Sequence, residues 1–260
     1  MALYSKCPEC GYERRPGEGG DPDVCPRCAL VFSKWMKHRF AAGPPAPGRR
    51  PKGDGEARGR LRGLWQRLGE RALFIDLEMS PARLYAYAAI YVVFFIWGWW
   101  FIFTDYHTNE IGQSFMHRID LVFHEAGHVV FRLFGRFVMI LGGSLGQLLM
   151  PLIVLLVLLL KNRDPFGASI GLWWLGQSLM DLAPYIDDAR AMRLTLLGGW
   201  TGRDRPGMHD WHNILSSLGL LQADHTLAGL TDGLGVLLML GAFVWGGYIL
   251  AQQFRRSPGA

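Results

Sequence analysis

Two long runs without a charged residue restrict the folds open to this chain of 260 residues. Residues 84–103 and residues 137–160 contain no Asp, Glu, Lys or Arg and are strongly apolar. A helix of about 20 such residues is long enough to cross the hydrocarbon core of a bilayer. Backbone groups find no partner in lipid, so a crossing segment must form its hydrogen bonds internally, as a helix does. The sequence therefore predicts an all-α polytopic membrane protein.

Further apolar stretches raise the predicted number of transmembrane helices to about five. They cover residues 84–103, 113–134, 137–160, 166–186 and 234–252. The glycines near the start of the third stretch predict either a close backbone approach or a short re-entrant piece before the helix.

Positive charges in the loops set the expected orientation, because cytoplasmic loops carry an excess of Lys and Arg. We expect the loop after the fourth span to face the cytoplasm, on the strength of Arg190, Arg193, Arg203 and Arg205. Five crossings from a cytoplasmic N terminus leave Arg255 and Arg256 outside, against the same bias. A re-entrant element over residues 214–230 would remove this conflict.

All four cysteines lie near the N terminus, as the pairs Cys7/Cys10 and Cys25/Cys28 with fourteen residues between them. Two CxxC pairs at this spacing are typical of a zinc ribbon, in which four thiolates hold one structural zinc ion. Two disulfides or a redox CxxC are the alternatives. Thiolate sites belong in a reducing compartment, so we expect a cytoplasmic N terminus and a partner there for the ribbon.

The chain divides near residue 80, where a polar, basic part rich in Gly and Pro gives way to a hydrophobic one. We predict a zinc ribbon and short helix over residues 1–40, a basic linker over residues 41–80, and a transmembrane domain over residues 81–254. The basic residues of the linker fit a juxtamembrane cluster beside the lipid bilayer. Nucleic-acid binding is the weaker interpretation, since no aromatic residues are interleaved with the charges.

Within the second predicted span, residues 124–128 form an HExxH motif. This motif predicts that the domain over residues 81–254 is metallopeptidase-like. Residues four apart share a helix face, so His124 and His128 can bind one metal ion. Glu125 lies beside them and can take a proton from an attacking water molecule. The alternative is a helix whose polar residues only line the seam between helices. Ionisable groups at membrane depth are costly, which favours the metal site.

A catalytic zinc needs a third protein ligand. The cytoplasmic end of the fourth span offers Asp181, Asp187 and Asp188, and Pro184 is expected to loosen the helix there. His209 is a rival ligand from a later cluster with His212. The alternative for that cluster is a solvated loop in which the histidines face water or pair with Asp210. One turn before His124, Asp120 is a candidate to hold the imidazole ring of His124.

These residues resemble the site-2 protease family of intramembrane zinc metalloproteases. In that family an HExxH helix precedes a Gly-containing membrane segment. A later helix then carries Asn-x-x-Pro and Asp-Gly, and this last aspartate is the third zinc ligand. Residues 142–151 correspond to the middle segment. Asp181 stands in the place of the family's Asn, and Ala189 in that of its Gly. The resemblance covers about residues 119–195 and implies Asp188 as the third ligand, then Asp187, then Asp181.

The sequence thus predicts a zinc-dependent intramembrane endopeptidase that cleaves a membrane-embedded protein substrate. It would hold one catalytic and one structural Zn²⁺ ion in a bacterial inner membrane. The glycine-rich segment at residues 142–146 is a candidate place for an extended substrate to add as a strand. The alternatives are a non-catalytic zinc-binding membrane scaffold or regulator, which a fourth ligand such as His209 would favour, and a metal-handling membrane protein.

Overall fold

The computed structural model describes residues 5–15, 17–41, 63 and 66–256. The chain forms two compact units, Met1–Gly63 and Leu64–Ala260. Most of the linker predicted over residues 41–80 lies outside the described residues, because residues 42–62 and 64–65 are not described.

The smaller unit consists of two similar turns that present the cysteine pairs, followed by helix α1 (Phe32–Ala41). In the first turn the Cys7 carbonyl accepts a hydrogen bond from Gly11 N–H, and in the second the Cys25 carbonyl accepts one from Ala29 N–H. Cys7 and Cys25 pack against Phe32 in a small core. The short helix predicted after the ribbon is confirmed as α1.

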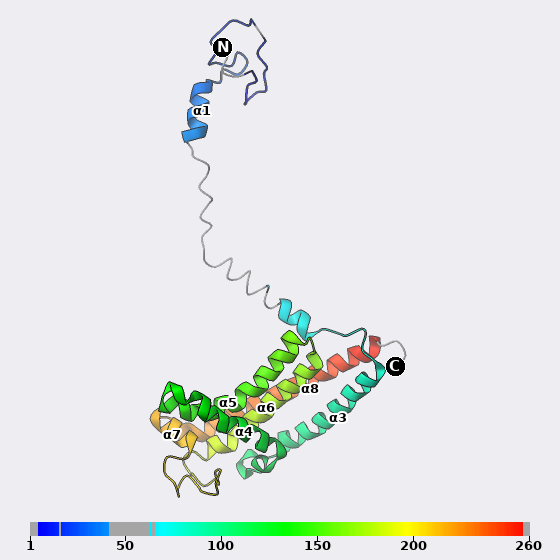
Figure 1. Cartoon of the computed structure of the whole chain (residues 1–260), viewed down its shortest axis with the longest axis vertical. Helices are drawn as coiled ribbons and strands as arrows, with labels where there is room; N and C mark the ends of the chain where they lie inside the picture. The colour runs from blue at the N-terminus through cyan, green and yellow to red at the C-terminus, as the bar shows by residue number, and fades with distance from the viewer. Residues whose placement is uncertain (1–4, 16, 42–62, 64–65, 257–260) are drawn as a thin grey trace. The chain divides into compact units, whose positions relative to one another are not determined.

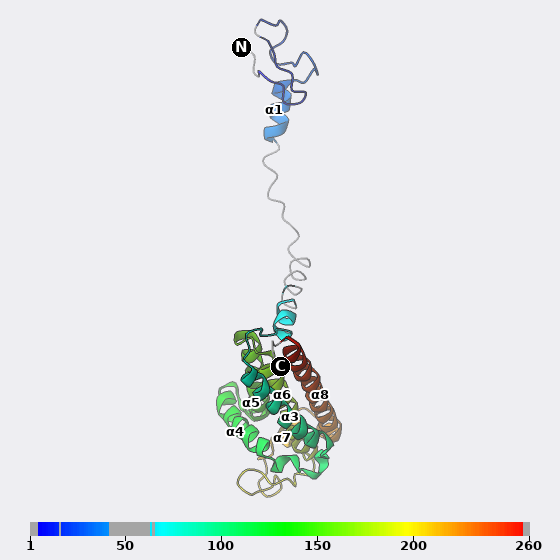
Figure 2. The ribbon, with the colours of Figure 1, turned by 90° about the vertical axis from the view of Figure 1, so that its right-hand side faces the viewer.

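The larger unit is helical, and its described residues contain no strand. Its helices are α3 (Pro81–Phe103), α4 (Phe115–Phe131), α5 (Arg136–Leu156), α6 (Pro165–Asp187), α7 (Asp210–Ser217) and α8 (Asp224–Arg256), and a π-helical turn, Val157–Lys161, extends α5. Figures 1 and 2 show α3, α5, α6 and α8 side by side, with α4 and α7 together at the end away from the C terminus.

Local sequence signals fix where these helices begin. Ser80 caps α3 by accepting a hydrogen bond from the backbone of Arg83, and Pro81 occupies the first turn. Asp164 caps α6 in the same way, with Pro165 in its first turn. A side-chain acceptor followed by proline is a strong start signal, because the cap satisfies a free N–H and proline needs none.

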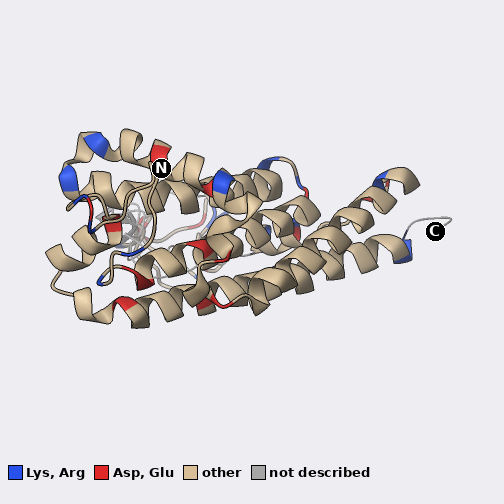
Figure 3. Cartoon of the chain, turned by 90° about the horizontal axis from the view of Figure 1, so that it is seen from below, with Lys and Arg blue, Asp and Glu red and all other residues tan. Residues whose placement is uncertain are grey.

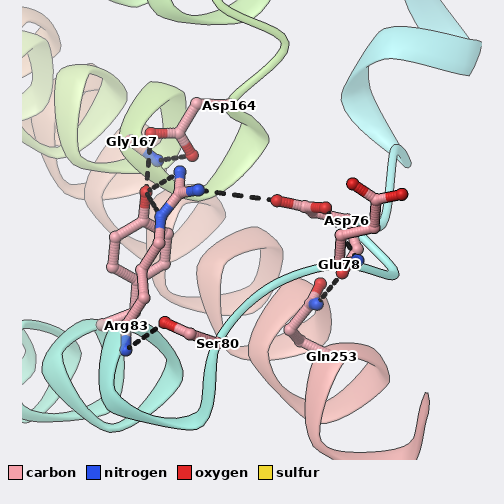
Figure 4. A network of polar contacts seen from close by, with 8 residues as sticks. Asp76, Glu78, Ser80, Arg83, Asp164, Gly167 and Gln253 are labelled. Carbon is pink, nitrogen blue, oxygen red and sulfur yellow. Dashed lines mark hydrogen bonds and ion pairs between the residues drawn. The ribbon is translucent and has the colours of Figure 1, made fainter. Parts of the chain in front are cut away.

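Polar contacts, together with the short connection between α5 and α6, bring the start of α3, the end of α5, the start of α6 and the end of α8 to one end of the bundle. Figure 4 shows Gln253 of α8 beside the segment that leads into α3, where it donates to the Asp76 carbonyl. Arg83 and Asp164 both contact the Tyr87 hydroxyl. Helices α3 and α6 therefore run in one direction, and α5 and α8 run in the other.

This arrangement corrects two expected positions relative to the start of α3. The C-terminal arginines were expected on the side opposite to it, and the loop with Arg190 on the same side. Arg255 and Arg256 end α8 close to the segment before α3. At the opposite end His107 and His225 both contact Asp187, which joins the residues after α3 to the end of α6 and the start of α8. The loop with Arg190 lies there as well, since Arg190 pairs with Asp224. The two groups of arginines therefore lie at opposite ends of the bundle.

Among the described residues, three helical segments are long and apolar enough to cross a membrane: Pro81–Phe103, Arg136–Lys161 and Leu221–Arg256. Figure 3 shows long stretches of helix without charged residues. The five predicted spans are not confirmed. Helix α4 has only 17 residues, whereas α6 is long enough but carries Gln177, Ser178 and Asp181, all buried between neighbouring helices.

Helix α6 can be more polar than a lipid-facing helix because α3, α4, α5 and α8 all pack against it. Trp173 of α6 is buried against Phe101 of α3 and Met239 of α8. A Cβ atom on Gly235 of α8 would lie 2.7 Å from the Gly176 carbonyl oxygen of α6. Glycine thus lets these two backbones approach closely, as small residues do in helix pairs within membranes.

Two further expectations about local structure meet different outcomes. Residues 142–146 do approach a neighbouring backbone closely, but they lie within the continuous helix α5 and form no re-entrant piece. Their backbone groups are used in the helix, so they offer no edge for strand addition. Residues 214–230 contain the end of α7, a turn and the start of α8.

A candidate metal centre in the larger unit

His124 and His128 of α4 meet Asp210 at the start of α7. The Oδ2 atom of Asp210 lies 3.1 Å from Nε2 of His124 and 3.2 Å from Nε2 of His128. The three ligand atoms all lie within 4.8 Å of one another. Two atoms each about 2.0–2.1 Å from a tetrahedral metal ion are about 3.3 Å apart, so the spacing suits one such ion.

Hydrogen bonds at the far side of each ring give both histidines the tautomer that binds metal. Nδ1 of His128 donates to the Met139 carbonyl over 2.9 Å, and Nδ1 of His124 donates to Oε1 of Gln147 over 3.2 Å. The Gln147 amide nitrogen in turn donates to Asp181. Because Nδ1 of each ring donates in this way, both Nε2 atoms face Asp210, where each can donate a proton to the carboxylate or, once that proton is released, offer a lone pair to a metal ion.

Glycine in α5 keeps the space beside both Nε2 atoms free. A Cβ atom on Gly143 would lie 2.4 Å from Nε2 of His124 and 2.6 Å from Nε2 of His128. A Cβ atom on Gly127 would lie only 2.0 Å from the Gly142 carbonyl oxygen, so α4 and α5 pack backbone to backbone. The donor set and this free space fit a metal ion.

Asp210 is held in place by groups outside α4. Its backbone N–H donates to the Tyr185 hydroxyl over 2.8 Å. Burial works against the charge on Asp210, but hydrogen bonds from His124 and His128 outweigh it and lower the pKa of Asp210 to about 2. Asp210 is therefore a carboxylate at neutral pH, as a metal ligand must be.

The three ligands line a cavity of about 460 Å³ together with Glu125. Glu125 is exposed, so its carboxylate is accessible from this cavity. The opposite wall is formed by residues 194–197 and 207–208 of the loop between α6 and α7. A carboxylate beside a possible metal ion, in a cavity that can admit a second molecule, is the arrangement that hydrolysis requires.

The carboxylates predicted as third ligand lie elsewhere. Asp188 accepts hydrogen bonds from the backbone of Arg193 and Leu194, and lies 3.3 Å from Nε2 of His209. Burial opposes its charge, but these contacts hold the pKa of Asp188 below its ordinary value. Asp187 contacts His107 and His225.

Asp181 comes closest of the predicted aspartates, because it supports Gln147 behind His124 and also contacts His117. Helix α6 continues through Pro184 to Asp187, so proline does not let the aspartates swing toward the histidines. Asp210 therefore takes the place beside the two histidines that was predicted for Asp188 as third ligand.

The histidine cluster is not a solvated loop. His209 is 1% exposed and faces Asp188, so it does not join the metal ligands. His212 donates from Nδ1 to the Ala189 carbonyl. The expectation that these histidines pair with Asp210 is wrong: Asp210 lies against His124 and His128 instead. Asp120 accepts from Trp174 and Ser178, so Gln147, and not Asp120, orients His124.

One signal in the sequence could have pointed to Asp210. It lies within a short polar run of the loop between the last two predicted spans, beside an aromatic residue suited to a membrane interface. Gln147 lies in the least charged part of the chain, where a polar side chain needs a partner. Neither signal specifies which groups meet.

The four cysteines of the smaller unit form a second group suited to a metal. Sγ of Cys7 lies 3.7 Å from Sγ of Cys28, and Sγ of Cys10 lies 3.7 Å from Sγ of Cys25. All four are free thiols, which excludes the disulfide alternative for this structure. Two sulfur atoms about 2.3 Å from a tetrahedral ion are about 3.8 Å apart, so the geometry fits a single ion.

Comparison of the chain with protein-family models, curated proteins and solved structures finds no significant match. The chemistry of the two groups of ligands therefore has to carry the functional argument.

Proposed function

We propose that this chain is a zinc-dependent membrane peptidase with a zinc ribbon at its N terminus. The observation that carries the proposal is the convergence of His124, His128 and Asp210 beside Glu125 in one cavity. Two histidines and one carboxylate form a ligand set that leaves a zinc coordination position open to substrate. His209, which could have closed the site as a further ligand, faces Asp188. This arrangement argues against the alternative in which the metal ion at this site has only a structural role.

Zinc bound to these three ligands would polarise the scissile carbonyl and favour ionisation of water at neutral pH. Glu125 accepts the proton of the attacking water and delivers it to the amine that leaves when the C–N bond breaks. Gln147 and the Met139 carbonyl keep both imidazoles oriented throughout. The loop over residues 194–197 closes one side of the cavity against the substrate.

Three apolar helical segments support an integral membrane protein, and we propose the bacterial inner membrane with the N terminus in the cytoplasm. The substrate would then be a membrane protein. Asp210 follows α6, whereas the resemblance to site-2 proteases implies a ligand within the corresponding helix. The proposal is therefore the broader class of membrane metallopeptidase, with the ribbon as a docking module for a cytoplasmic partner.

The test is Glu125→Gln in the full-length protein, purified in mild detergent, with fluorescein-labelled casein and isolated membranes as substrates. We expect two metal ions per chain in both proteins, and at least about a 100-fold loss of cleavage in the variant, because only the general base is removed. Glu110→Gln is the matched control, since Glu110 precedes a short turn, makes no side-chain capping hydrogen bond there and does not line the cavity. Equal cleavage by Glu125→Gln and the unmodified protein, or no cleavage by either, would reject the peptidase.

A further inference from the structure

A third imidazole, besides those of His124 and His128, lines the cavity of the candidate metal centre. His117 lies seven residues before His124 on α4, and both residues line the cavity. Seven residues make nearly two full helical turns, so the two side chains share a face and lie about 10 Å apart along the axis. Leu121, between them, lines the cavity as well. The cavity therefore follows one face of α4 beyond the metal ligands.

His117 is held by a buried carboxylate. Its Nδ1 atom lies 2.9 and 3.0 Å from the two oxygens of Asp181, and Asp181 is only 6% exposed. A buried carboxylate is costly without a cation beside it, and the imidazolium form of His117 supplies that cation. Within the described part of the chain Nε2 of His117 makes no hydrogen bond, and the side chain is 34% exposed. Its free N–H is thus available to a molecule in the cavity.

Resting on the proposed peptidase function, we propose that His117 is a substrate-binding residue that recognises an acidic side chain. An extended peptide advances about 3.3–3.6 Å per residue, so the distance of about 10 Å corresponds to three residues. The acidic side chain lies about three residues from the bond that is cut. Asp181 positions the imidazole and maintains its charge. Arg136, which also lines the cavity, adds positive charge near the Met139 end.

The experiment profiles cleavage of a tryptic peptide library by the zinc-loaded, full-length protein in detergent, with cut positions read by mass spectrometry. We expect Asp and Glu to be enriched at one position about three residues from the cut. In His117→Gln this preference should fall about tenfold, because a charge-assisted hydrogen bond is lost. Cleavage of peptides with Asn or Gln at that position should be unchanged, as should metal content.

Two further variants separate recognition from folding. Asp181→Asn keeps the shape of the side chain but removes the counter-charge, and should weaken the same preference. Metal content is measured in this variant as well, because Asp181 also accepts a hydrogen bond from Gln147 behind His124. His107→Gln is the matched control, since His107 makes a similar contact with Asp187 yet does not line the cavity. The proposal is overturned if the unmodified protein cuts peptides without an acidic preference, or if His117→Gln retains that preference. If the unmodified protein cuts no peptide, the proposed function itself fails, and this inference fails with it.

Discussion

The absence of a Cβ atom at Gly143 decides whether the imidazoles of His124 and His128 can share one metal ion. Gly143 has ordinary helical geometry, so its role is to leave room and not to permit an unusual backbone angle. The atoms nearest to a Cβ atom at this position would be Nε2 of His124 and the Cε1 and Nε2 atoms of His128. Any larger residue would push the rings from the positions that Gln147 and the Met139 carbonyl maintain.

We therefore expect Gly143→Ala to lower the metal affinity of this centre about 10- to 100-fold, as displacement of supporting groups does in zinc sites. Metal analysis of the purified protein should then give one ion per chain, held by the cysteines. Gly233→Ala is the control, because its added methyl group would meet no atom within 4 Å. Two ions per chain in Gly143→Ala would contradict the argument.

The two turns of the ribbon differ at one residue that has a positive φ angle in both. Gly11 has φ +69° after Cys10, and Ala29 has φ +59° after Cys28. A left-handed conformation costs a residue with a Cβ atom roughly 1–2 kcal/mol, which glycine avoids.

Ala29→Gly should accordingly stabilise the ribbon by about 1 kcal/mol, and Gly11→Ala should destabilise it by a similar amount. The measurement is the rate at which a chelator removes the metal from the cysteine group, which should fall in the first variant and rise in the second. Equal rates in both variants would show that the backbone angle is not a source of strain.

At the scale of elements, the loop between α6 and α7 is anchored by Asp188, which directly follows α6. The Asp188 carboxylate accepts hydrogen bonds from the backbone N–H groups of residues 193 and 194 and contacts His209 just before α7. Leu196 N–H donates to the Trp200 carbonyl, which closes the loop on itself. The same carboxylate therefore supports the wall of the cavity and the approach to Asp210.

Asp188→Ala leaves these donors without their acceptor, and we expect it to weaken the loop by about 1–3 kcal/mol. Limited trypsin digestion should then cut faster after Arg193 and Arg203, while cuts elsewhere in the larger unit keep their rates. Asp204→Ala is a useful comparison, because Asp204 contacts only Thr201 within the exposed part of the loop. A digestion pattern identical to that of the unmodified protein would exclude an anchoring role for Asp188.

At the scale of the whole larger unit, the start of α3 and the end of α8 lie at the same end of the helical bundle. The segment before α3 contacts the end of α8 through Ala72 with Trp245 and through Asp76 with Gln253. If α3 and α8 both cross the bilayer, the entry to α3 and the exit from α8 lie on the same side of the membrane.

We therefore expect topology reporters fused before α3 and after residue 260 to report the same side. A reporter inserted after Arg203 should report the other side, because that loop lies at the end of the bundle where Asp187 contacts His107 and His225. Fluorescent-protein and alkaline-phosphatase fusions provide the two complementary readouts. Opposite sides for the two terminal reporters would exclude this packing of α3 against α8.

Local patterns in the sequence determined much of this protein. Hydrophobic runs predicted the extents of α3 and α6 within a few residues, because the length of an apolar run is a property of neighbouring residues. The spacing within residues 124–128 put two imidazoles on one face, and the cysteine spacing predicted four thiols close together, which the structure confirms. Each of these depends on contacts over only a few residues or on one repeated turn.

The tertiary structure alone decided which carboxylate meets the imidazoles. Asp210 lies 86 residues after His124, and its approach depends on how α6, the following loop and α7 pack. Asp188 was the favoured third ligand because of its place after Pro184, but its carboxylate accepts hydrogen bonds from backbone N–H groups of its own loop. The number of helices facing lipid was likewise undecided by sequence, since α6 is buried among its neighbours. Such choices depend on competition between partners distant in sequence, which only packing resolves.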